Sequence, residues 1–326
     1  MGDQTTTSNQ LPQNAIGRSD THEGIWARLE GEVSSGISTK SVLLVGAGSG
    51  GSNTAELLVR SGVQNLTVID PDAVGPENLS RTVYVAADIG TLKVNALGQR
   101  LSAINSSVEY HAVPRAIQDI GFEGLDHLIG SSDLVIAATD DPEAQYLLNH
   151  FAYARLVPAV FAGVYRRGMG GEVIFTIPTL TPCLRCCTPH RIDARRTGEM
   201  NYGTGRMQGE PALGADINHI VTASVKLAIG LLELTEEPNG SARELVMAAL
   251  GRGCNYLQMS TTPGFFDDSF FKEARGQLAY QSLWWSAHSD PACPVCGGSP
   301  ADPTSIMFEK PDTQELLSLF NTVKEM

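Results

Sequence analysis

The sequence VLLVGAGSGGS, residues 42–52, contains the strongest fold signal in this chain. Its first four residues, Val42–Val45, form a continuous apolar run, which is typical of a strand buried on both faces of a sheet. Glycines follow at G-x-G-x-x-G spacing, at Gly46, Gly48 and Gly51, and a helix is predicted over Asn53–Ser61. Such a turn lets backbone N–H groups approach a phosphate, and the helix start favours its negative charge. The stretch predicts a nucleotide-binding corner; the alternative is a plain strand–turn–helix connection.

Strand and helix signals continue to alternate along the chain. Further strands are predicted at Asn65–Asp70, Ser107–Val113, Ser131–Ala138, Leu156–Gly163, Gly171–Ile177 and Asn255–Ser260, and helices at Asp88–Asn105, Pro142–Leu156 and Ala215–Leu234. Strands that alternate with helices form βαβ units around a mostly parallel sheet. The predicted fold class is therefore α/β, with a Rossmann-like, mostly parallel sheet that carries helices on both faces.

The domain organisation is predicted from shifts in composition. Residues 1–22 are polar and are expected to be a mobile N-terminal segment, and residues 301–326 are expected to be a C-terminal tail. One large domain, residues 23–300, lies between them, with its Rossmann core at about 40–177. Residues 178–213 interrupt the pattern, because they are rich in Pro, Gly, Arg and Thr. A loop of this length inside a compact domain is usually functional or disordered.

Charge and hydropathy exclude several classes of function. The 326-residue chain has a net charge of −13 and a pI of about 4.9, so it should repel polyanions, and no nucleic-acid partner is expected. No apolar run approaches the roughly 18 residues that cross a bilayer. The N-terminus also lacks the basic and apolar regions of a secretory signal. We therefore expect a cytoplasmic protein without membrane association.

Polar residues that follow the glycine turn distinguish between nucleotides. Asp70 ends the next strand, about twenty residues on, where a carboxylate accepts hydrogen bonds from ribose hydroxyls. Asn78, Arg81 and Lys93 add a polar group and two cations, and Asp140 follows the strand LVIAAT. A dinucleotide can be held by the glycine loop alone, whereas a triphosphate with Mg²⁺ needs added cations and a carboxylate for the metal. The joint spacing favours Mg-ATP, although each cation taken singly is more often a solvated surface charge.

Four of the six cysteines form two C-x-x-C pairs, Cys183/Cys186 and Cys293/Cys296. Together they would make a Cys₄ zinc site of the closed, structural kind. That site would tie the 178–213 loop to the C-terminal portion of the domain. The alternative is a redox C-x-x-C, which requires a thiol at the start of a helix.

The order of these motifs resembles one known family. GAGSGGS, DPDAVGPENLSR, LKVNA, ATDD and the two distant C-x-x-C pairs, within about residues 40–300, are similar to ThiF, MoeB and the adenylation domains of ubiquitin-activating (E1-like) enzymes. The resemblance implies that backbone at Gly48 and Ser49 cradles phosphate and that Asp70 holds the ribose. It also implies a phosphate pocket and a metal ligand among the polar residues that follow: Asp72, Asn78, Ser80, Arg81, Lys93, Asp140 and Asp141. Arg81 and Lys93 would be its cations, and Asp140 would hold Mg²⁺.

The resemblance implies an ATP-dependent adenylyltransferase that activates the C-terminal Gly carboxylate of a ubiquitin-fold or sulfur-carrier protein and releases pyrophosphate. A homodimer is implied as well. Many relatives have a further cysteine in the loop after the first zinc pair, but residues 188–213 contain none, and Cys187 is the possible substitute. Two Arg-containing segments, Tyr165–Arg167 and Arg191–Arg196, either grip an acidic substrate or form solvated loop faces.

Three alternatives to this activity remain open at the level of sequence. The same chemistry could act on a peptide or on a small carboxylic acid. A second alternative is an NAD-dependent oxidoreductase, which leaves Arg81, Lys93 and Asp140 unexplained. The third is a scaffold without turnover, against which the intact set of Asp70, Arg81, Lys93 and Asp140 argues.

Overall fold

The structure, a computed structural model, describes residues 24–189, 191, 211–236, 240–266 and 278–297. The predicted N-terminal segment and C-terminal tail lie outside these residues, as does most of the Arg191–Arg196 segment. The boundaries predicted for the domains therefore stay predictions.

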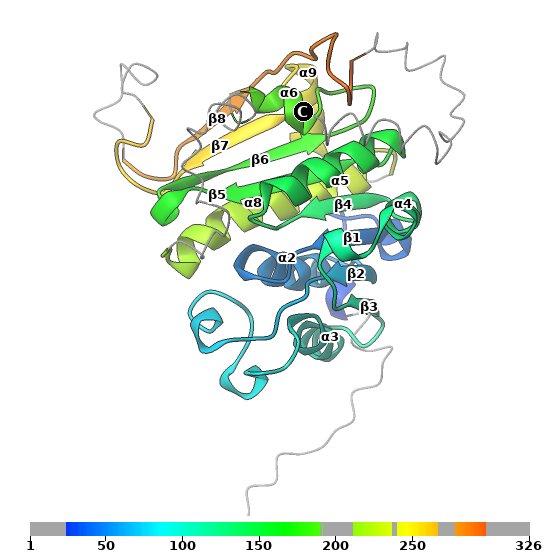
Figure 1. Cartoon of the computed structure of the whole chain (residues 1–326), viewed down its shortest axis with the longest axis vertical. Helices are drawn as coiled ribbons and strands as arrows, with labels where there is room; N and C mark the ends of the chain where they lie inside the picture. The colour runs from blue at the N-terminus through cyan, green and yellow to red at the C-terminus, as the bar shows by residue number, and fades with distance from the viewer. Residues whose placement is uncertain (1–23, 190, 192–210, 237–239, 267–277, 298–326) are drawn as a thin grey trace, which may run out of the picture.

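An eight-stranded sheet in the order β3-β2-β1-β4-β5-β6-β7-β8 forms the centre of the domain (Figure 1). Its first half is parallel and consists of β1 (Ser41–Val45), β2 (Asn65–Ile69), β3 (Glu109–Val113), β4 (Leu134–Ala137) and β5 (Ala159–Val164). The second half continues antiparallel from β5 through β6 (Gly170–Thr176), β7 (Tyr256–Ser260) and β8 (Ser282–Trp285). The predicted α/β class with a mostly parallel sheet is confirmed, and the antiparallel half is an addition that the sequence patterns did not indicate.

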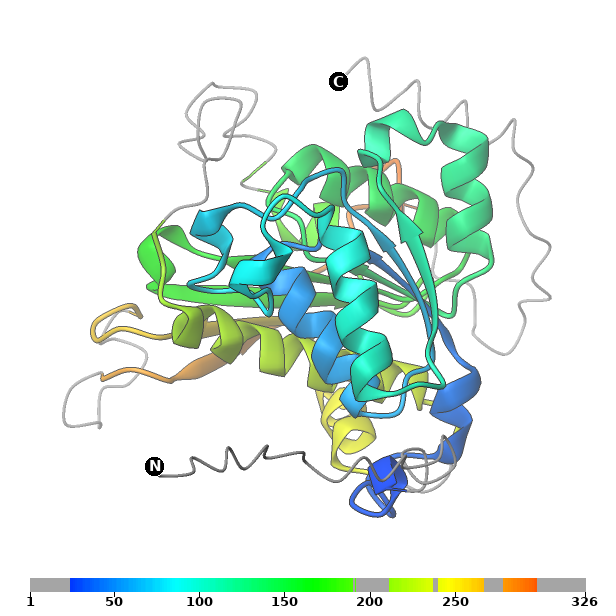
Figure 2. The same ribbon diagram turned by 90° about the horizontal axis from the view of Figure 1, so that it is seen from below.

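Helices cover both faces of the sheet (Figures 1 and 2). One face is covered by α2 (Ser49–Arg60), α3 (Lys93–Ile104), α8 (Gly214–Leu232) and α9 (Ser241–Gly251). The other is covered by α4 (Phe122–Gly130), α5 (Pro142–Ala154) and the short α6 (Leu184–Cys187). Short 3₁₀ turns are η1 (Ser35–Thr39), η2 (Pro76–Asn78), η3 (Ala86–Asp88), η4 (Ile117–Asp119) and η5 (Arg166–Gly168).

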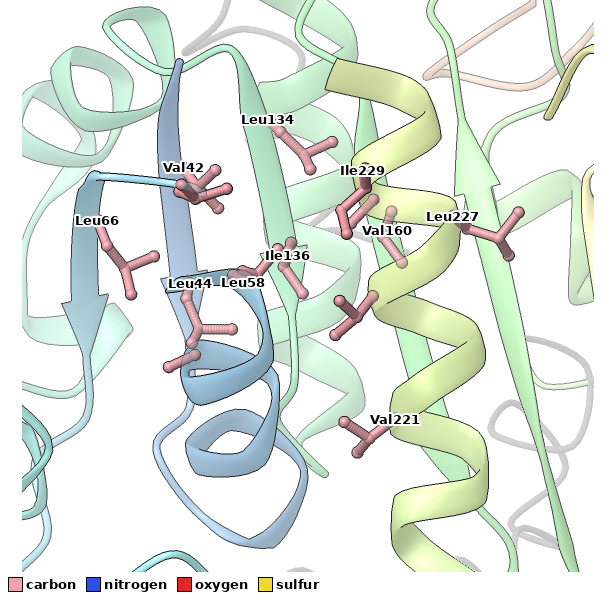
Figure 3. Close-up of a cluster of buried hydrophobic side chains, with 14 of the residues drawn as sticks. Val42, Leu44, Leu58, Leu66, Leu134, Ile136, Val160, Val221, Leu227 and Ile229 are labelled. Carbon is pink, nitrogen blue, oxygen red and sulfur yellow. The ribbon is translucent and has the colours of Figure 1, made fainter. Parts of the chain in front are cut away.

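Strand β1 shows why its apolar run is continuous. Val42 and Leu44 pack with α2 and α8 in one core cluster, whereas Leu43 and Val45 belong to the cluster under α4 and α5. Successive side chains of a strand point to opposite faces, so a strand covered on both sides needs apolar residues throughout. Figure 3 shows the first of these clusters, in which Leu58 of α2 and Val221 of α8 lie over the strands.

Helix α8 is the one described helix that is long and apolar enough to cross a membrane, and 61% of its apolar window is buried inside the protein. It packs against α2, α9 and strands β4, β5 and β6. Its apolar composition is therefore explained by a position in the core of the domain.

Some element boundaries differ from the predicted ones. Helix α2 begins at Ser49, four residues before Asn53, because the second half of the glycine turn is already helical. Helix α3 begins at Lys93 and not at Asp88, whose carboxylate instead accepts from the Val85 N–H at 2.8 Å and closes η3. Helices α4 and α9 and strand β8 were missed. Strand β8 has only four residues, whereas α4 and α9 were overlooked although they are 9 and 11 residues long.

Candidate nucleotide site and zinc centre

The glycine turn lies where the strand order reverses. Strand β1 has β2 on one side and β4 on the other, and its carboxyl end leads directly into the turn. In open α/β sheets, ligands bind outside the carboxyl ends of the strands at such a switch point. Gly48 is the N-cap of α2, so the free N–H groups and the positive dipole of this helix face the same place.

Glycine occurs at these three positions for different structural reasons. Gly46 has φ +98°, and a Cβ there would lie 2.6 Å from the Ala138 carbonyl oxygen. A Cβ at Gly51 would lie 1.8 Å from the Gly46 oxygen. Both are therefore required by the packing of the turn itself. At Gly48 a Cβ would meet no protein atom within 4 Å, so this glycine leaves open space where a ligand could approach the backbone.

Asp70 is 6% exposed and supports the turn directly. One carboxylate oxygen accepts from the Ala47 N–H at 2.7 Å, and the other accepts from the Asp72 N–H at 2.9 Å. Burial raises the pKa of Asp70, and these backbone donors together with Lys93 counteract the rise. The structure thus gives Asp70 a role in shaping the turn, while its contact with a ribose stays a prediction.

Lys93 and Asp140 meet at the same edge of the sheet. The Lys93 ammonium lies 2.7 Å from an Asp72 carboxylate oxygen and 3.9 Å from Asp70. Asp140 follows β4 and is exposed, but partial burial by the surrounding chain raises its pKa. The negative charge of Asp141 adds to this rise in the pKa of Asp140, and the positive charge of Lys93 opposes it.

Arg81 is joined to the start of α2 by Asn53. The Asn53 side-chain amide donates to the Ser49 oxygen at 2.8 Å and to the Arg81 oxygen at 3.2 Å. Helix α8 begins on the other side of this segment, since a Cβ at Gly214 would lie 3.4 Å from the Arg81 Cα. The Arg81 backbone is therefore held between the first turns of two helices.

Other predicted site residues have local structural contacts. The Asn78 side-chain oxygen accepts from the Gly75 N–H at 2.9 Å and closes η2, and the exposed Ser80 hydroxyl donates to the Glu77 oxygen at 3.3 Å. The Asp141 carboxylate caps α5 by accepting from the Glu143 N–H at 2.9 Å, and it also accepts from Gln118 at 2.8 Å. Asp141 is thus engaged at the helix start.

The sequence patterns did not single out Tyr84 as part of the site. It is 4% exposed, and its hydroxyl donates to the Ala47 oxygen at 2.7 Å, inside the glycine turn. A second contact, at 3.3 Å, joins it to the Lys93 oxygen. Tyr84 therefore braces both the phosphate turn and the start of α3. Its position three residues after Arg81 was the available signal.

The two C-x-x-C pairs come together as predicted. All four sulfur atoms lie within 4.8 Å of one another, with Cys183 3.7 Å from Cys293 and Cys186 3.4 Å from Cys296. Tetrahedral zinc with Zn–S bonds of about 2.3 Å sets its sulfurs roughly 3.8 Å apart, so the cluster fits this ion. The Asp290 N–H points at Cys186 Sγ at 3.3 Å and the Val295 N–H at Cys293 Sγ at 3.5 Å, as expected around thiolate ligands.

The cluster cysteines are available as metal ligands, because all six cysteines of the chain are free. Hydrogen bonds among the four clustered thiols raise the pKa of Cys183 and Cys186 and lower the pKa of Cys293 and Cys296. Cys187, adjacent to the cluster, is different: it is 6% exposed and packs against Asn255. Burial raises the pKa of Cys187 to about 12. This environment argues against the suggested use of Cys187 as a covalent nucleophile.

The fold and the site define a nucleotide-binding α/β protein whose sheet is extended by an antiparallel half and closed by a cysteine cluster. A sequence profile described as the ThiF family matches residues 23–302, and the chain belongs to that family.

Three curated relatives are named adenylyltransferases. The chain is 35% identical over 155 residues to the sulfur carrier protein adenylyltransferase of Thermus thermophilus, covering 46% of this chain and 55% of the relative. It is 35% identical over 147 residues to the molybdopterin-synthase adenylyltransferase of Escherichia coli, covering 44% and 57%. The E. coli ThiS adenylyltransferase is 28% identical over 264 residues, covering 80% and 88%. In most of these comparisons the chain spans about half the length of the curated relatives it matches.

Solved structures of E. coli MccB share the fold. The complex of MccB with ATP superposes with a TM-score of 0.58 at 16% identity and covers 80% of this chain and 68% of MccB. A complex with AMPCPP and MccA gives 0.59 and covers 88% and 77%. At this identity the likeness concerns the fold alone.

Proposed function

We propose that this chain is an ATP- and Mg²⁺-dependent adenylyltransferase that activates the C-terminal carboxylate of a ubiquitin-fold or sulfur-carrier protein. The observation that carries the proposal is the convergence of the glycine turn, Lys93 and Asp140 at the switch point of the sheet. The names of the relatives, which include adenylyltransferases of sulfur carriers and a SAMP-activating enzyme, support this substrate class.

In the reaction a carboxylate oxygen of the substrate attacks the α-phosphorus of ATP. A new acyl–phosphate bond forms, the bond from the α-phosphorus to the bridging oxygen breaks, and pyrophosphate leaves with its electrons. The attacking carboxylate is already ionised near pH 7, so no general base is required. Positioning and cations can therefore provide most of the acceleration.

Each residue of the site has a proposed part in that step. Backbone N–H groups at Gly48 and Ser49 hold phosphate, and Arg81 and Lys93 neutralise charge on the phosphate oxygens as pyrophosphate departs. Asp140 would offer a carboxylate oxygen as a ligand for Mg²⁺, while the Lys93 ammonium would contact phosphate and not the metal. When bound, Mg²⁺ supplies positive charge to the phosphate oxygens. We further propose a cytoplasmic homodimer with a structural zinc.

The proposal is tested by ATP–pyrophosphate exchange. The purified chain is combined with Mg-ATP and a panel of ubiquitin-fold proteins that end in Gly-Gly. We expect one of them to stimulate exchange, because only an acyl-adenylate can return label from pyrophosphate to ATP. The control is the same partner without its last two glycines. A chain that binds no Mg-ATP, or that exchanges equally with the truncated partner, would refute the proposal.

The alternative substrate is a peptide. Structures with this fold hold the MccA peptide, and residues 188–213 contain no cysteine for a thioester. A chain that stops at the acyl-adenylate would suit a peptide as well as a carrier protein. Peptides with a free C-terminal carboxylate are therefore included in the panel, and stimulation by peptides alone would select this alternative.

A further inference from the structure

The turn between β5 and β6 has an unusual conformation close to the nucleotide site. It consists of η5, Arg166–Gly168, and follows the carboxyl end of β5, at the edge of the sheet that carries the glycine turn. Arg167 adopts φ 58° and ψ 19°, the left-handed region that residues with a side chain rarely occupy. Such a conformation persists only where the surroundings hold it, and it is concentrated at functional sites.

Hydrogen bonds from a neighbouring segment hold this turn. The Thr261 hydroxyl donates to the Gly168 oxygen, and the Thr262 hydroxyl donates to the Met169 oxygen at 3.1 Å. The Thr261 N–H donates to the same Met169 oxygen at 3.1 Å. The turn is therefore braced from the end of β7, and its shape does not depend on the two arginines alone.

A buried polar network fixes the base of the turn. Glu172 of β6 is 4% exposed, and one of its carboxylate oxygens accepts from the Tyr165 and Tyr256 hydroxyls, both at 2.6 Å. Its other oxygen forms an ion pair with Arg191. Gln258 donates to the Tyr165 hydroxyl at 2.9 Å. Both carboxylate oxygens of Glu172 are engaged, and this buried network holds Tyr165 and the turn that follows it in one orientation.

The surface at this turn combines cations with apolar side chains. Arg166 and Arg167 are exposed, and beside them Met169 is 42% exposed. The turn also contacts the segment before α8, since a Cβ at Gly168 would lie 3.1 Å from the Ala212 Cβ. Leu213, the next residue of that segment, is 71% exposed. We name these four exposed residues, Arg166, Arg167, Met169 and Leu213, the turn surface.

The turn surface is continuous with the nucleotide site. Leu213 is followed by Gly214, the first residue of α8, which lies against the backbone of Ser80 and Arg81. The segment therefore joins the exposed arginines of the turn to the phosphate pocket. An extended chain that ends at that pocket would pass over this segment.

We propose that the turn surface docks the partner whose C-terminal carboxylate is adenylated, and that Arg166 and Arg167 select acidic side chains upstream of that carboxylate. The inference rests on the proposed function for the identity of the partner as the substrate. With a net charge of −13 the chain repels acidic partners in general, so local cations are needed to orient one. Met169 and Leu213 supply apolar contact area. The partly exposed Asp216 also lies close to the turn, since a Cβ at Gly168 would lie 3.2 Å from its carboxylate, so a partner must contact the arginines away from this acidic group.

The test uses fluorescently labelled peptides that end in Gly-Gly and carry one leucine upstream. One version has glutamates around the leucine, the second has serines and the third has lysines. Anisotropy is measured with the full chain and Mg-ATP. We expect the glutamate peptide to bind at least about tenfold more tightly than the serine peptide, with an affinity that falls as salt rises. The lysine peptide should bind most weakly. Equal affinity for the three peptides would overturn the proposal.

Variants locate the effect on the turn. The double variant Arg166→Glu and Arg167→Glu should remove the preference for glutamate and favour the lysine peptide. The matched control is Arg252→Glu, which reverses an exposed arginine between α9 and β7. Arg167→Gly removes one charge but relieves the left-handed backbone, so the melting temperature should stay the same or rise while the affinity falls. Loss of affinity in the control alone, or none in the turn variants, would contradict the proposal.

Parallel measurements of peptide affinity, exchange and Mg-ATP binding distinguish failure of the docking surface from failure of the proposed adenylation. Exchange and Mg-ATP binding are measured in parallel, and the turn variants should bind Mg-ATP as the wild type does. A chain that prefers the acidic peptide through its arginines but never exchanges would keep the docking surface and refute adenylation. A chain that exchanges with an acidic partner equally well when both arginines are reversed would refute the docking surface and keep adenylation.

Discussion

At the scale of single residues, the site contains two kinds of side chain: those that hold the glycine turn in shape and those that are proposed to act on a ligand. Asp70 and Tyr84 hold the glycine turn through Ala47, one from each side. Arg81 and Asp140 are the residues proposed to act on the nucleotide, as a cation for phosphate and as a metal ligand. These two residues are therefore where substitutions should affect the reaction and spare the fold.

Arg81→Ala and Asp140→Ala should each lower ATP–pyrophosphate exchange by a factor of about 10² to 10³ or more, the range for losing one charge-stabilising group. The melting temperature should change much less than the exchange activity, because neither residue belongs to the buried core. The measurement is exchange with a stimulating partner, alongside thermal denaturation. Arg60→Ala is the matched control, since Arg60 is exposed and pairs only within its own helix with Glu56. Unchanged exchange in either site variant would contradict the assignment.

Cys187 should be inert toward alkylation. Its pKa is raised to about 12 by burial, so almost no thiolate is present at pH 8 in the folded protein. With zinc bound, iodoacetamide at pH 8 should label Cys254, which is partly exposed, well before Cys187. Peptide mass spectrometry distinguishes the two. Cys187→Ala should retain exchange activity, and rapid labelling of Cys187 in the folded chain would show that its environment is misassigned.

At the scale of elements, the close packing of two helices requires a glycine whose role the sequence patterns did not reveal. Gly230 lies in the last turn of α8, two residues before the helix ends at Leu232, although glycine has a low helix propensity. A Cβ at this position would lie 2.3 Å from the Ala242 oxygen of α9. The glycine therefore sets how closely α8 and α9 approach, and the close approach lets α9 cover one face of the sheet.

Gly230→Ala should destabilise the protein by about 1 to 3 kcal/mol, because the added methyl group forces α8 and α9 apart. Chemical denaturation measures the change. The matched control is Gly251→Ala at the end of α9, where a Cβ meets no atom within 4 Å. That substitution should be neutral or slightly stabilising, since alanine favours a helix more than glycine does. Equal effects at the two positions would show that contact between α8 and α9 is not what Gly230 provides.

At the scale of the whole molecule, the cysteine cluster joins segments 110 residues apart. Cys183 and Cys186 follow β6, whereas Cys293 and Cys296 follow the edge strand β8. Residues 286–297 have no regular secondary structure and few buried side chains, so the cluster is the main device that holds this end of the chain to the sheet. A metal that closes such a long loop contributes to stability by restricting the unfolded chain.

Metal analysis should find about one zinc per chain, as a Cys₄ site requires. Removal of zinc by a chelator, or Cys293→Ser, should lower the melting temperature and increase protease cleavage near residues 286–297. Mg-ATP binding should be affected less, because the glycine turn follows β1 in the parallel part of the sheet, whereas the cysteines follow β6 and β8 in the antiparallel part. Cys254→Ser is the control for a cysteine outside the cluster. A folded, zinc-free protein with unchanged stability would refute the zinc centre.

Local patterns were sufficient to predict the parallel half of the sheet and the glycine turn. The signals used were the glycine spacing, the apolar run of Val42–Val45 and the cations after Asp70. Each depends on residues close in sequence, because the geometry of a turn and the burial of a strand on both faces restrict the residue types of a short segment. The pairing of the two C-x-x-C motifs was also predicted, because four thiols at this spacing have one obvious joint use. The sequence by itself thus determined the fold class, the glycine turn and the membership of the cysteine cluster.

Only the tertiary structure decided the rest. Contacts between residues tens of positions apart in the chain create three of these features. They are the antiparallel strands β6 to β8, the burial of Cys187 against Asn255, and the hydrogen bond from Thr261 to Gly168 that braces the Arg166–Gly168 turn. Such long-range contacts produce no periodic pattern of apolar residues, so they cannot be predicted from the residues on either side of each partner. The physical reason is that the pKa of a thiol and the stability of a left-handed backbone both depend on the surrounding side chains. Tertiary packing, and not the local sequence, determines which side chains those are.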